Sequence, residues 1–198
     1  MPLWGATDSD ESKPKNLTTA QKKQVFANAS GWVLEAGSAL SGNDNTDADP
    51  EVLVAIGELS TSIGAADITE VEMITTTADK SEGFTISVRV RYNEAVDVVT
   101  TGGTPTLAVT NGNEGTGTGR GPHSLSYASG TGTNELIFSL AIAAANAATN
   151  ADDVLSVGAQ SIALNSGTIK DAAGTASNAS LVISEAQGTA AGSVTVTA

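Results

Sequence analysis

The regular alternation of apolar and polar residues is strongest between residues 83 and 142. Large apolar side chains occupy every second position from Phe84 to Tyr92, while Arg89 and Arg91 are among the polar residues between them. The run from Leu136 to Ile142 alternates in the same way. A period of two places the apolar groups on one face of a β-strand and the polar groups on the other, solvent-facing side. Both runs therefore predict half-buried strands.

Strand signals continue from Ile68 to the C-terminus, separated by turns rich in Gly, Thr and Asn. We expect strands at 68–75, 83–92, 95–99, 104–110, 122–128, 134–142, 153–157, 160–164, 178–184 and 191–197. We expect no substantial helix in this half. Strands at this spacing are typical of an antiparallel β-sandwich. The sequence therefore predicts an all-β fold, with a β-sandwich domain over residues 67–198.

Residues 1–66 have a different pattern, in which short apolar islands alternate with polar turn-forming residues. The island residues are candidates for docking on a partner protein: Leu3, Trp4, Val25, Phe26, Trp32, Val33, Leu34, Val52, Val54 and Ile56. The islands are too few and too widely spaced to predict a core of their own. We therefore expect an extended N-terminal docking arm over residues 1–66.

Two local features refine this interpretation of the arm. Thr18 and Gln21 have the spacing of a capping box, which predicts one short helix over about residues 19–27 and no other helix in the arm. Trp4 and Trp32 are of the residue type enriched where one protein anchors on another. Packing of both tryptophans on the chain's own β-domain is the alternative.

Composition and charge narrow the range of functions. The net charge is −13, and residues 24–198 carry 19 acidic against 5 basic residues. Such a surface repels nucleic acid and anionic membranes. No window approaches the roughly 18 apolar residues of a membrane span, and the N-terminus lacks the apolar stretch of a secretory signal. We expect a soluble protein made in the cytoplasm, with neither nucleic acid nor membrane as a partner.

The motifs give no support for an enzyme. The Gly-rich segment 111–121 matches neither dinucleotide nor P-loop spacing. His123 is the only histidine and the chain has no cysteine, so zinc would lack ligands. Asp44, Asp47 and Asp49 lie close together without EF-hand spacing, although calcium at loop ends stays open. We expect no catalytic site, no cofactor and no dedicated metal site.

Residues 84–183 resemble a known family. The segments FTISVRVRYNEAVDV, TGGTPTLAVT, YASGTGTNELIFSLAI and SGTIKDAAGTASNASLVI are similar to bacterial Ig-like repeats of large adhesins and surface proteins. This resemblance implies that residues 67–198 form an Ig-like sandwich. The chain departs from these repeats by its single copy and by the insertion GTGTGRG.

The first 66 residues carry a second resemblance. MPLWG, SKPK, GWVL and EVLVAIGEL resemble small virion structural proteins of marine, cyanophage-like tailed phages. This resemblance implies a capsid decoration protein on the outer capsid surface, docked on the major capsid protein through its arm. Further copies of itself on the particle and a weak host-surface contact are additional expected partners. An adhesin-type module for a host glycan or protein, and a neck or tail component, are the alternatives.

Overall fold

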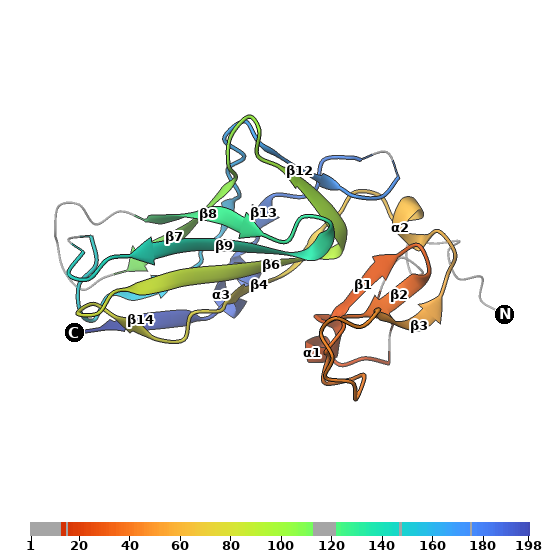
Figure 1. The fold of residues 1–198 in the computed structure, drawn as a ribbon, viewed down its shortest axis with the longest axis horizontal. Helices are drawn as coiled ribbons and strands as arrows, with labels where there is room; N and C mark the ends of the chain where they lie inside the picture. The colour runs from red at the N-terminus through yellow and green to blue at the C-terminus, as the bar shows by residue number, and fades with distance from the viewer. Residues whose placement is uncertain (1–12, 15, 113–121, 147, 175) are drawn as a thin grey trace.

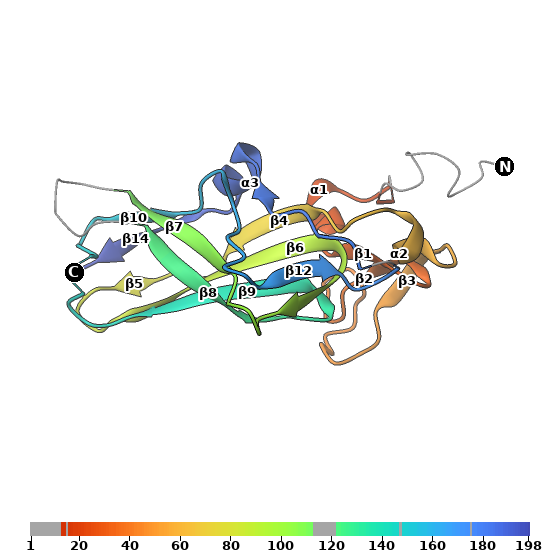
Figure 2. The same ribbon diagram turned by 90° about the horizontal axis from the view of Figure 1, so that it is seen from above.

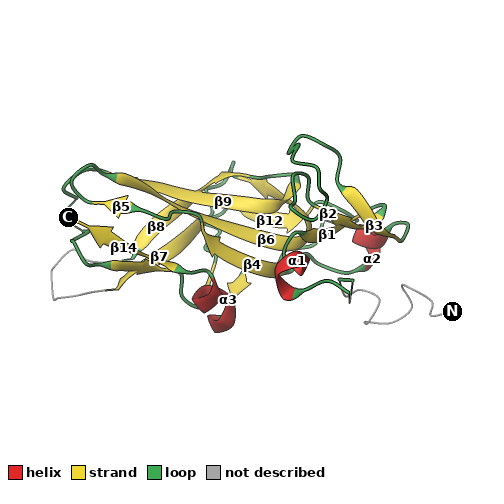
Figure 3. Ribbon diagram, turned by 90° about the horizontal axis from the view of Figure 1, so that it is seen from below, coloured by secondary structure: helices red, strands yellow, loops and turns green. Residues whose placement is uncertain are grey.

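The computed structural model describes residues 13–14, 16–112, 122–146, 148–174 and 176–198, and this part of the chain is mostly β. Three short helices interrupt the strands: α1 (Thr19–Lys22), α2 (Leu59–Ser62) and α3 (Glu185–Ala190). The all-β prediction is confirmed at this level (Figure 3).

The strands fall into an N-terminal group and a larger C-terminal group. The first group is β1 (Val25–Asn28), β2 (Gly31–Leu34) and β3 (Glu51–Ala55). The second group is β4 (Ile68–Met73), β5 (Ala78–Asp79), β6 (Phe84–Val99), β7 (Thr106–Gly112), β8 (His123–Ser129), β9 (Thr133–Ile142), β10 (Val154–Ser156), β11 (Gln160–Ser161), β12 (Thr168–Asp171), β13 (Val182–Ile183) and β14 (Ser193–Thr197). Below, residues 13–66 are called the N-terminal unit and residues 67–198 the β-domain.

Strand β6 is the element that connects the two groups. It pairs antiparallel with β9, β4 and β12, and its residue Glu94 forms a parallel ladder pair with Ala27 of β1. From β9 the sheet continues in the order β8-β7-β10-β14-β5. Figure 1 shows the consequence, with β1 to β3 beside one end of the β-domain and the C-terminus at the other end.

The core of the β-domain follows from the alternation seen in the sequence. Ile86, Val88 and Val90 of β6 are fully buried, as are Leu136 and Phe138 of β9. These side chains belong to one apolar cluster that draws residues from Ala66 to Val196. Helix α3 lies against β4 (Figure 2). The sequence pattern therefore correctly predicted which face of these strands is buried.

The N-terminal unit is not an extended arm in its described part. Strands β1, β2 and β3 form an antiparallel meander, and two short helices accompany it where at most one was expected. A second apolar cluster lies inside the unit, formed by Val25, Ala27, Trp32, Leu34 and Leu59. The expectation that these islands lack a core of their own is therefore wrong. The islands between Val25 and Ile56 lie in or next to short strands, and pairing brings together side chains that are far apart in the sequence.

The tight approach of β2 to β3 depends on Gly31. This residue has a φ of +135°, and a Cβ atom there would lie 2.0 Å from the carbonyl oxygen of Val54. Only glycine tolerates both the backbone conformation and the contact. The preceding turn is supported by Asn28, whose side-chain oxygen accepts a hydrogen bond from the Ser30 amide at 2.8 Å. A local sequence signal therefore positions the hairpin.

The predicted capping box is present, but the helix after it is shorter than expected. Gln21 donates its backbone N–H to the Thr18 hydroxyl, and its side chain accepts from the Thr18 amide. Helix α1 ends at Lys22, because the residues from Val25 onward pair with β2 instead. The cap thus fixes where the helix starts, and strand pairing fixes where it ends.

Other differences from the predicted elements are local. The strands expected at 83–92 and 95–99 form one strand, β6, whose register with β9 breaks between Arg91 and Val96. Strands β5 and β12 were not predicted, and neither was helix α3. Helix α3 begins with a second capping box, in which Ser184 and Gln187 exchange hydrogen bonds.

The buried face of β6 yields a first test. Val88→Asp places a carboxylate among fully buried apolar groups, which costs several kcal/mol against a total stability of roughly 5–15 kcal/mol. We expect this variant not to fold, as measured by far-UV circular dichroism and thermal melting. Thr85→Asp is the matched control, because Thr85 is exposed on the same strand. Equal damage from both substitutions would show that both faces of β6 are buried.

Candidate functional site

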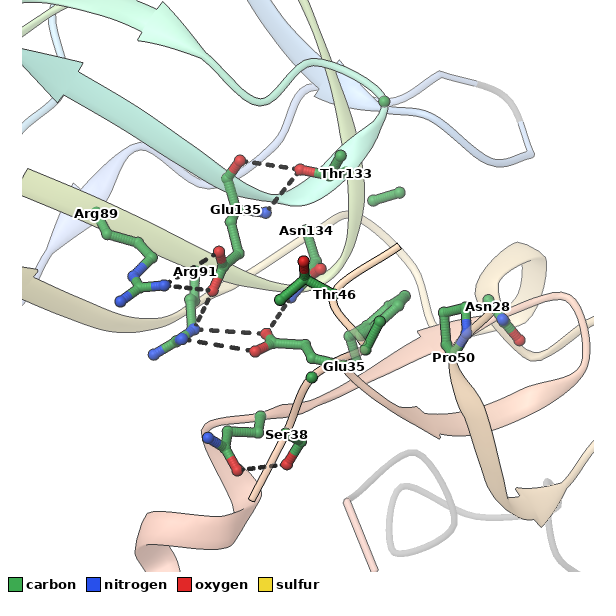
Figure 4. Close-up of a pocket in the computed structure, with 16 residues that line it drawn as sticks. Asn28, Glu35, Ser38, Thr46, Pro50, Arg89, Arg91, Thr133, Asn134 and Glu135 are labelled. Carbon is green, nitrogen blue, oxygen red and sulfur yellow. Dashed lines mark hydrogen bonds and ion pairs between the residues drawn. The ribbon is translucent and has the colours of Figure 1, made fainter. Parts of the chain in front are cut away.

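A cleft lies between the N-terminal unit and the β-domain. It has a volume of about 830 Å³ and is open to solvent. One wall comes from β1, from the end of β2 and from the segment after it, and includes Phe26 and Pro50. The other comes from β6, β9 and the turn before β9, and includes Arg91 and Glu135. Figure 4 shows the two walls facing each other across the cleft.

Arg91 is the central charge of this junction. It lies on β6 and is only 8% exposed. Its Nη1 donates to Glu70 Oε2 at 2.7 Å, and its Nε donates to Glu135 Oε1. The same Nε lies 3.4 Å from Glu35 Oε1. Glu35 and Glu135 both point toward this guanidinium group in Figure 4.

Arg89 forms the outer part of the same cluster. Its guanidinium contacts Glu72 at 2.9 Å and Glu135 at 3.3 Å, and its side chain is 26% exposed. The cross-strand register explains these partners, because Glu70 lies opposite Arg91 and Glu72 opposite Arg89 on β4. The two arginines therefore lie on a face that is lined with carboxylates.

Three polar contacts of the cluster cross the junction. Lys23 of the N-terminal unit pairs with Glu70, and Glu35 pairs with Arg91. The amide of Asn134 donates to Glu35 Oε1 at 2.8 Å. These contacts fix the N-terminal unit to the β-domain, and they do so with groups that are partly or fully buried.

The pKa directions agree with this arrangement. Burial alone would lower the pKa of Arg91, but Glu35, Glu70 and Glu135 together raise it above its usual value. Burial alone would raise the pKa of Glu70, because it disfavours the charged carboxylate. The hydrogen bonds from Lys23 and Arg91 nevertheless hold this pKa below its usual value. Glu35 differs, because burial and the neighbouring Glu135 raise its pKa despite Arg91. The ion pairs of Glu70 therefore persist through neutral pH.

The rest of the cleft is lined by small, polar and apolar groups. Ser38 donates its hydroxyl proton to Gln24 Oε1 at 2.7 Å, and Thr46 lines the same wall. Arg89 and Arg91 are already bound to carboxylates, so neither guanidinium group is free to hold an anion. The arrangement can bind a polar partner, and it shows neither a nucleophile paired with a base nor a set of metal ligands.

Other candidate groups fall outside this cleft. His123 is buried in the β-domain, where its Nε2 lies 3.1 Å from the Thr149 hydroxyl, and burial lowers its pKa although Asp153 opposes the change. Within the described residues no group of three or more His, Cys, Asp or Glu side chains is arranged to hold a metal ion, Asp44, Asp47 and Asp49 included. Most of the Gly-rich segment, residues 113–121, lies outside the described residues. No helix in the described part is long and apolar enough to cross a membrane.

The ten predicted docking residues separate into four groups. Val25, Trp32, Val33 and Leu34 are buried within the chain. Phe26, Val54 and Ile56 are partly buried, whereas Val52 is 47% exposed. Leu3 and Trp4 lie outside the described residues.

For Trp32, the structure supports neither of the two positions considered from the sequence. Its side chain packs in the apolar cluster of the N-terminal unit, away from the core of the β-domain. Trp32, Val25 and Leu34 therefore stabilise this unit in the free chain. The part of the predicted surface that stays exposed is on β3.

Arg89 and Arg91 were not predicted as site residues. Alternation placed both on the water-facing side of β6, where the N-terminal unit and β4 in fact contact Arg91 and carboxylates of β4 and β9 contact Arg89. A usable signal existed, because Glu70-x-Glu72 and Arg89-x-Arg91 are complementary charge pairs at the spacing of one strand face.

Comparisons of the chain with protein-family models, with curated proteins and with solved structures give no match. The role of the junction therefore rests on its geometry and chemistry.

The two arginines provide a matched test of the junction. Arg91→Met leaves Glu35, Glu70 and Glu135 without their shared buried cation, and breaking such a group costs about 3–5 kcal/mol. Arg89→Met removes more exposed ion pairs, which are worth about 0–1 kcal/mol each. We expect urea denaturation to show a larger decrease in the free energy of unfolding for Arg91→Met than for Arg89→Met. Equal losses would show that burial does not distinguish the two guanidinium groups.

Proposed function

We propose that this protein is a virion structural protein without catalytic activity, a head decoration protein on the outer capsid surface. In this proposal the N-terminal unit docks on the major capsid protein, and the β-domain, an Ig-like sandwich, is displayed outward. The virion-like motifs of residues 1–66 and the Ig-like motifs of residues 84–183 support the two halves of the proposal. The antiparallel pairing of β6 with β4, β9 and β12 around one core fits an Ig-like domain.

The observation that carries the proposal is the exposed apolar edge of the N-terminal unit. Strand β3 is the last strand of its sheet, and Val52 and Leu53 are 47% and 36% exposed. The register between β2 and β3 shifts at this point, so Leu53 is the extra residue of a β-bulge. Bulges on edge strands discourage the addition of another strand. The edge therefore suits docking through side chains better than docking through strand addition.

The distribution of charge fits display of the β-domain. Residues 67–198 carry 13 acidic and 5 basic residues. Many copies held close together on a particle would stay apart and soluble because of this shared charge. The ion pairs at the junction would give every copy the same orientation relative to its docked unit.

The competing function is that of an adhesin-type module that binds a host-surface glycan or protein. The open cleft at the junction favours it, because the cleft offers amide, hydroxyl and carboxylate groups beside Phe26 and Pro50. Location distinguishes the two functions, since a decoration protein occupies regular sites on the head. A neck or tail component would instead be present in few copies at one vertex or along the tail.

Strand β3 gives the test of docking. Purified protein is mixed with capsids that lack it, and its occupancy is measured by co-sedimentation and by electron microscopy. We expect Val52→Glu to weaken binding at least about tenfold, because the contact would bury a charge. Val182→Glu is the matched control, since Val182 is exposed on β13 of the β-domain and lies outside the proposed contact. Full occupancy by Val52→Glu would exclude β3 as the docking surface.

A further inference from the structure

A buried carboxyl group lies at the junction, apart from the ion pairs described above. Glu94 is 0% exposed, and neither of its carboxyl oxygens has a hydrogen-bond partner among the described residues. It lies on β6 where the register with β9 breaks, and it is the residue that pairs with Ala27 of β1. Buried polar groups without partners are rare in folded proteins and call for an explanation.

The charges around Glu94 are all of its own sign. Asp171 of β12 and Asp67, which precedes β4, both act on it unfavourably. Strand β1 contributes no charged residue, and Glu135 of β9 is bound to the two arginines. Burial, followed by Asp171 and Asp67, raises the pKa of Glu94 to about 8. The docked arrangement therefore keeps Glu94 neutral at neutral pH.

The ionised carboxylate of Glu94 needs hydration by water. The strand pairs around Glu94 differ in how easily they separate and let water in. Nine residue pairs join β6 to β9 and four join β6 to β12, but β6 and β1 share only the pair of Ala27 with Glu94. Separation of β1 from β6 breaks this one ladder pair and leaves the apolar cluster of the N-terminal unit intact. It also breaks the three polar contacts across the junction, so hydration of the carboxylate competes with the ion pairs of Lys23 and Glu35.

We propose that Glu94 is a proton-controlled latch, whose ionisation releases the N-terminal unit from the β-domain and opens the cleft between them. The latch goes beyond the docking function proposed above and does not depend on it.

The direction of the pH effect follows from the proton count. A solvated Glu loses its proton near its ordinary pKa of 4.5, whereas docked Glu94 keeps it up to about pH 8. The docked form thus holds one more proton across this window, and docking weakens as the pH rises through it. Lys13 has the opposite sign, because burial lowers its pKa to about 8 and its effect on docking begins above that pH.

Amide hydrogen exchange of the full chain tests the latch between pH 5.5 and pH 8. After correction for intrinsic exchange rates, we expect protection of the backbone amides at the Ala27–Glu94 pair of β1 and β6 to fall at least about tenfold, because one unit of pKa difference changes the equilibrium tenfold. Protection of β9 should stay constant. Equal loss in β9 would mean global unfolding and would overturn the proposal.

Two neutral variants isolate the carboxyl group. Glu94→Gln and Glu94→Met both remove its charge, and either one should make protection of these amides of β1 and β6 independent of pH or reduce its change at least about tenfold. Asp97→Asn is the control, since Asp97 is exposed on the same strand and the variant should behave like the unmodified protein. A pH response that persists in both neutral variants would overturn the assignment to Glu94. Capsid occupancy of the same variants at pH 6 tests docking on the particle separately.

Discussion

The structure depends on one strand, β6, taking part in two different environments. Its apolar face lies in the core of the β-domain, and its polar face around Arg91 receives the N-terminal unit. A guanidinium group in this position is costly to bury, and the cost is offset because three carboxylates surround it. Without Arg91 the same surface would carry an excess of negative charge, and of the three polar contacts across the junction only Lys23–Glu70 and Glu35–Asn134 would remain.

This dependence explains which parts of the fold were predictable from the sequence. Strands β6 and β9 are long and buried on one face, so their period of two is visible without any tertiary information. Strands β1 and β2 are four residues each, and their apolar side chains form a core only because the two strands pair with one another and with β3. A short apolar island of this kind has the same sequence pattern whether it pairs within a local sheet or docks on a partner protein. The meander was therefore mistaken for an extended arm.

The site was harder to predict than the fold for a related reason. Alternation shows that the side chains of Arg89 and Arg91 point away from the core of the β-domain. It does not show which residues contact them on the other face of the strand. That information lies in cross-strand register, and the register of β4 against β6 includes an irregularity between Ile68 and Glu70. Glu94 was equally hidden, because it is a polar residue at a position of the apolar face, between Tyr92 and Val96, and sits at a register shift. Simple packing rules tend to fail at functional sites, and such sites often lie at irregular positions of this kind.

The junction combines contacts that respond to protons in opposite ways. Glu70 is held ionised by Lys23 and Arg91, so its contribution to stability is present at neutral pH and is lost only as the pH falls through its lowered pKa. Glu94 contributes in the opposite direction, since the folded arrangement prefers its neutral form. A junction fixed by ion pairs alone would be tightest over a broad neutral range. With a buried neutral carboxyl group at the single pair that joins β1 to β6, that range has an upper limit near the point where Glu94 ionises.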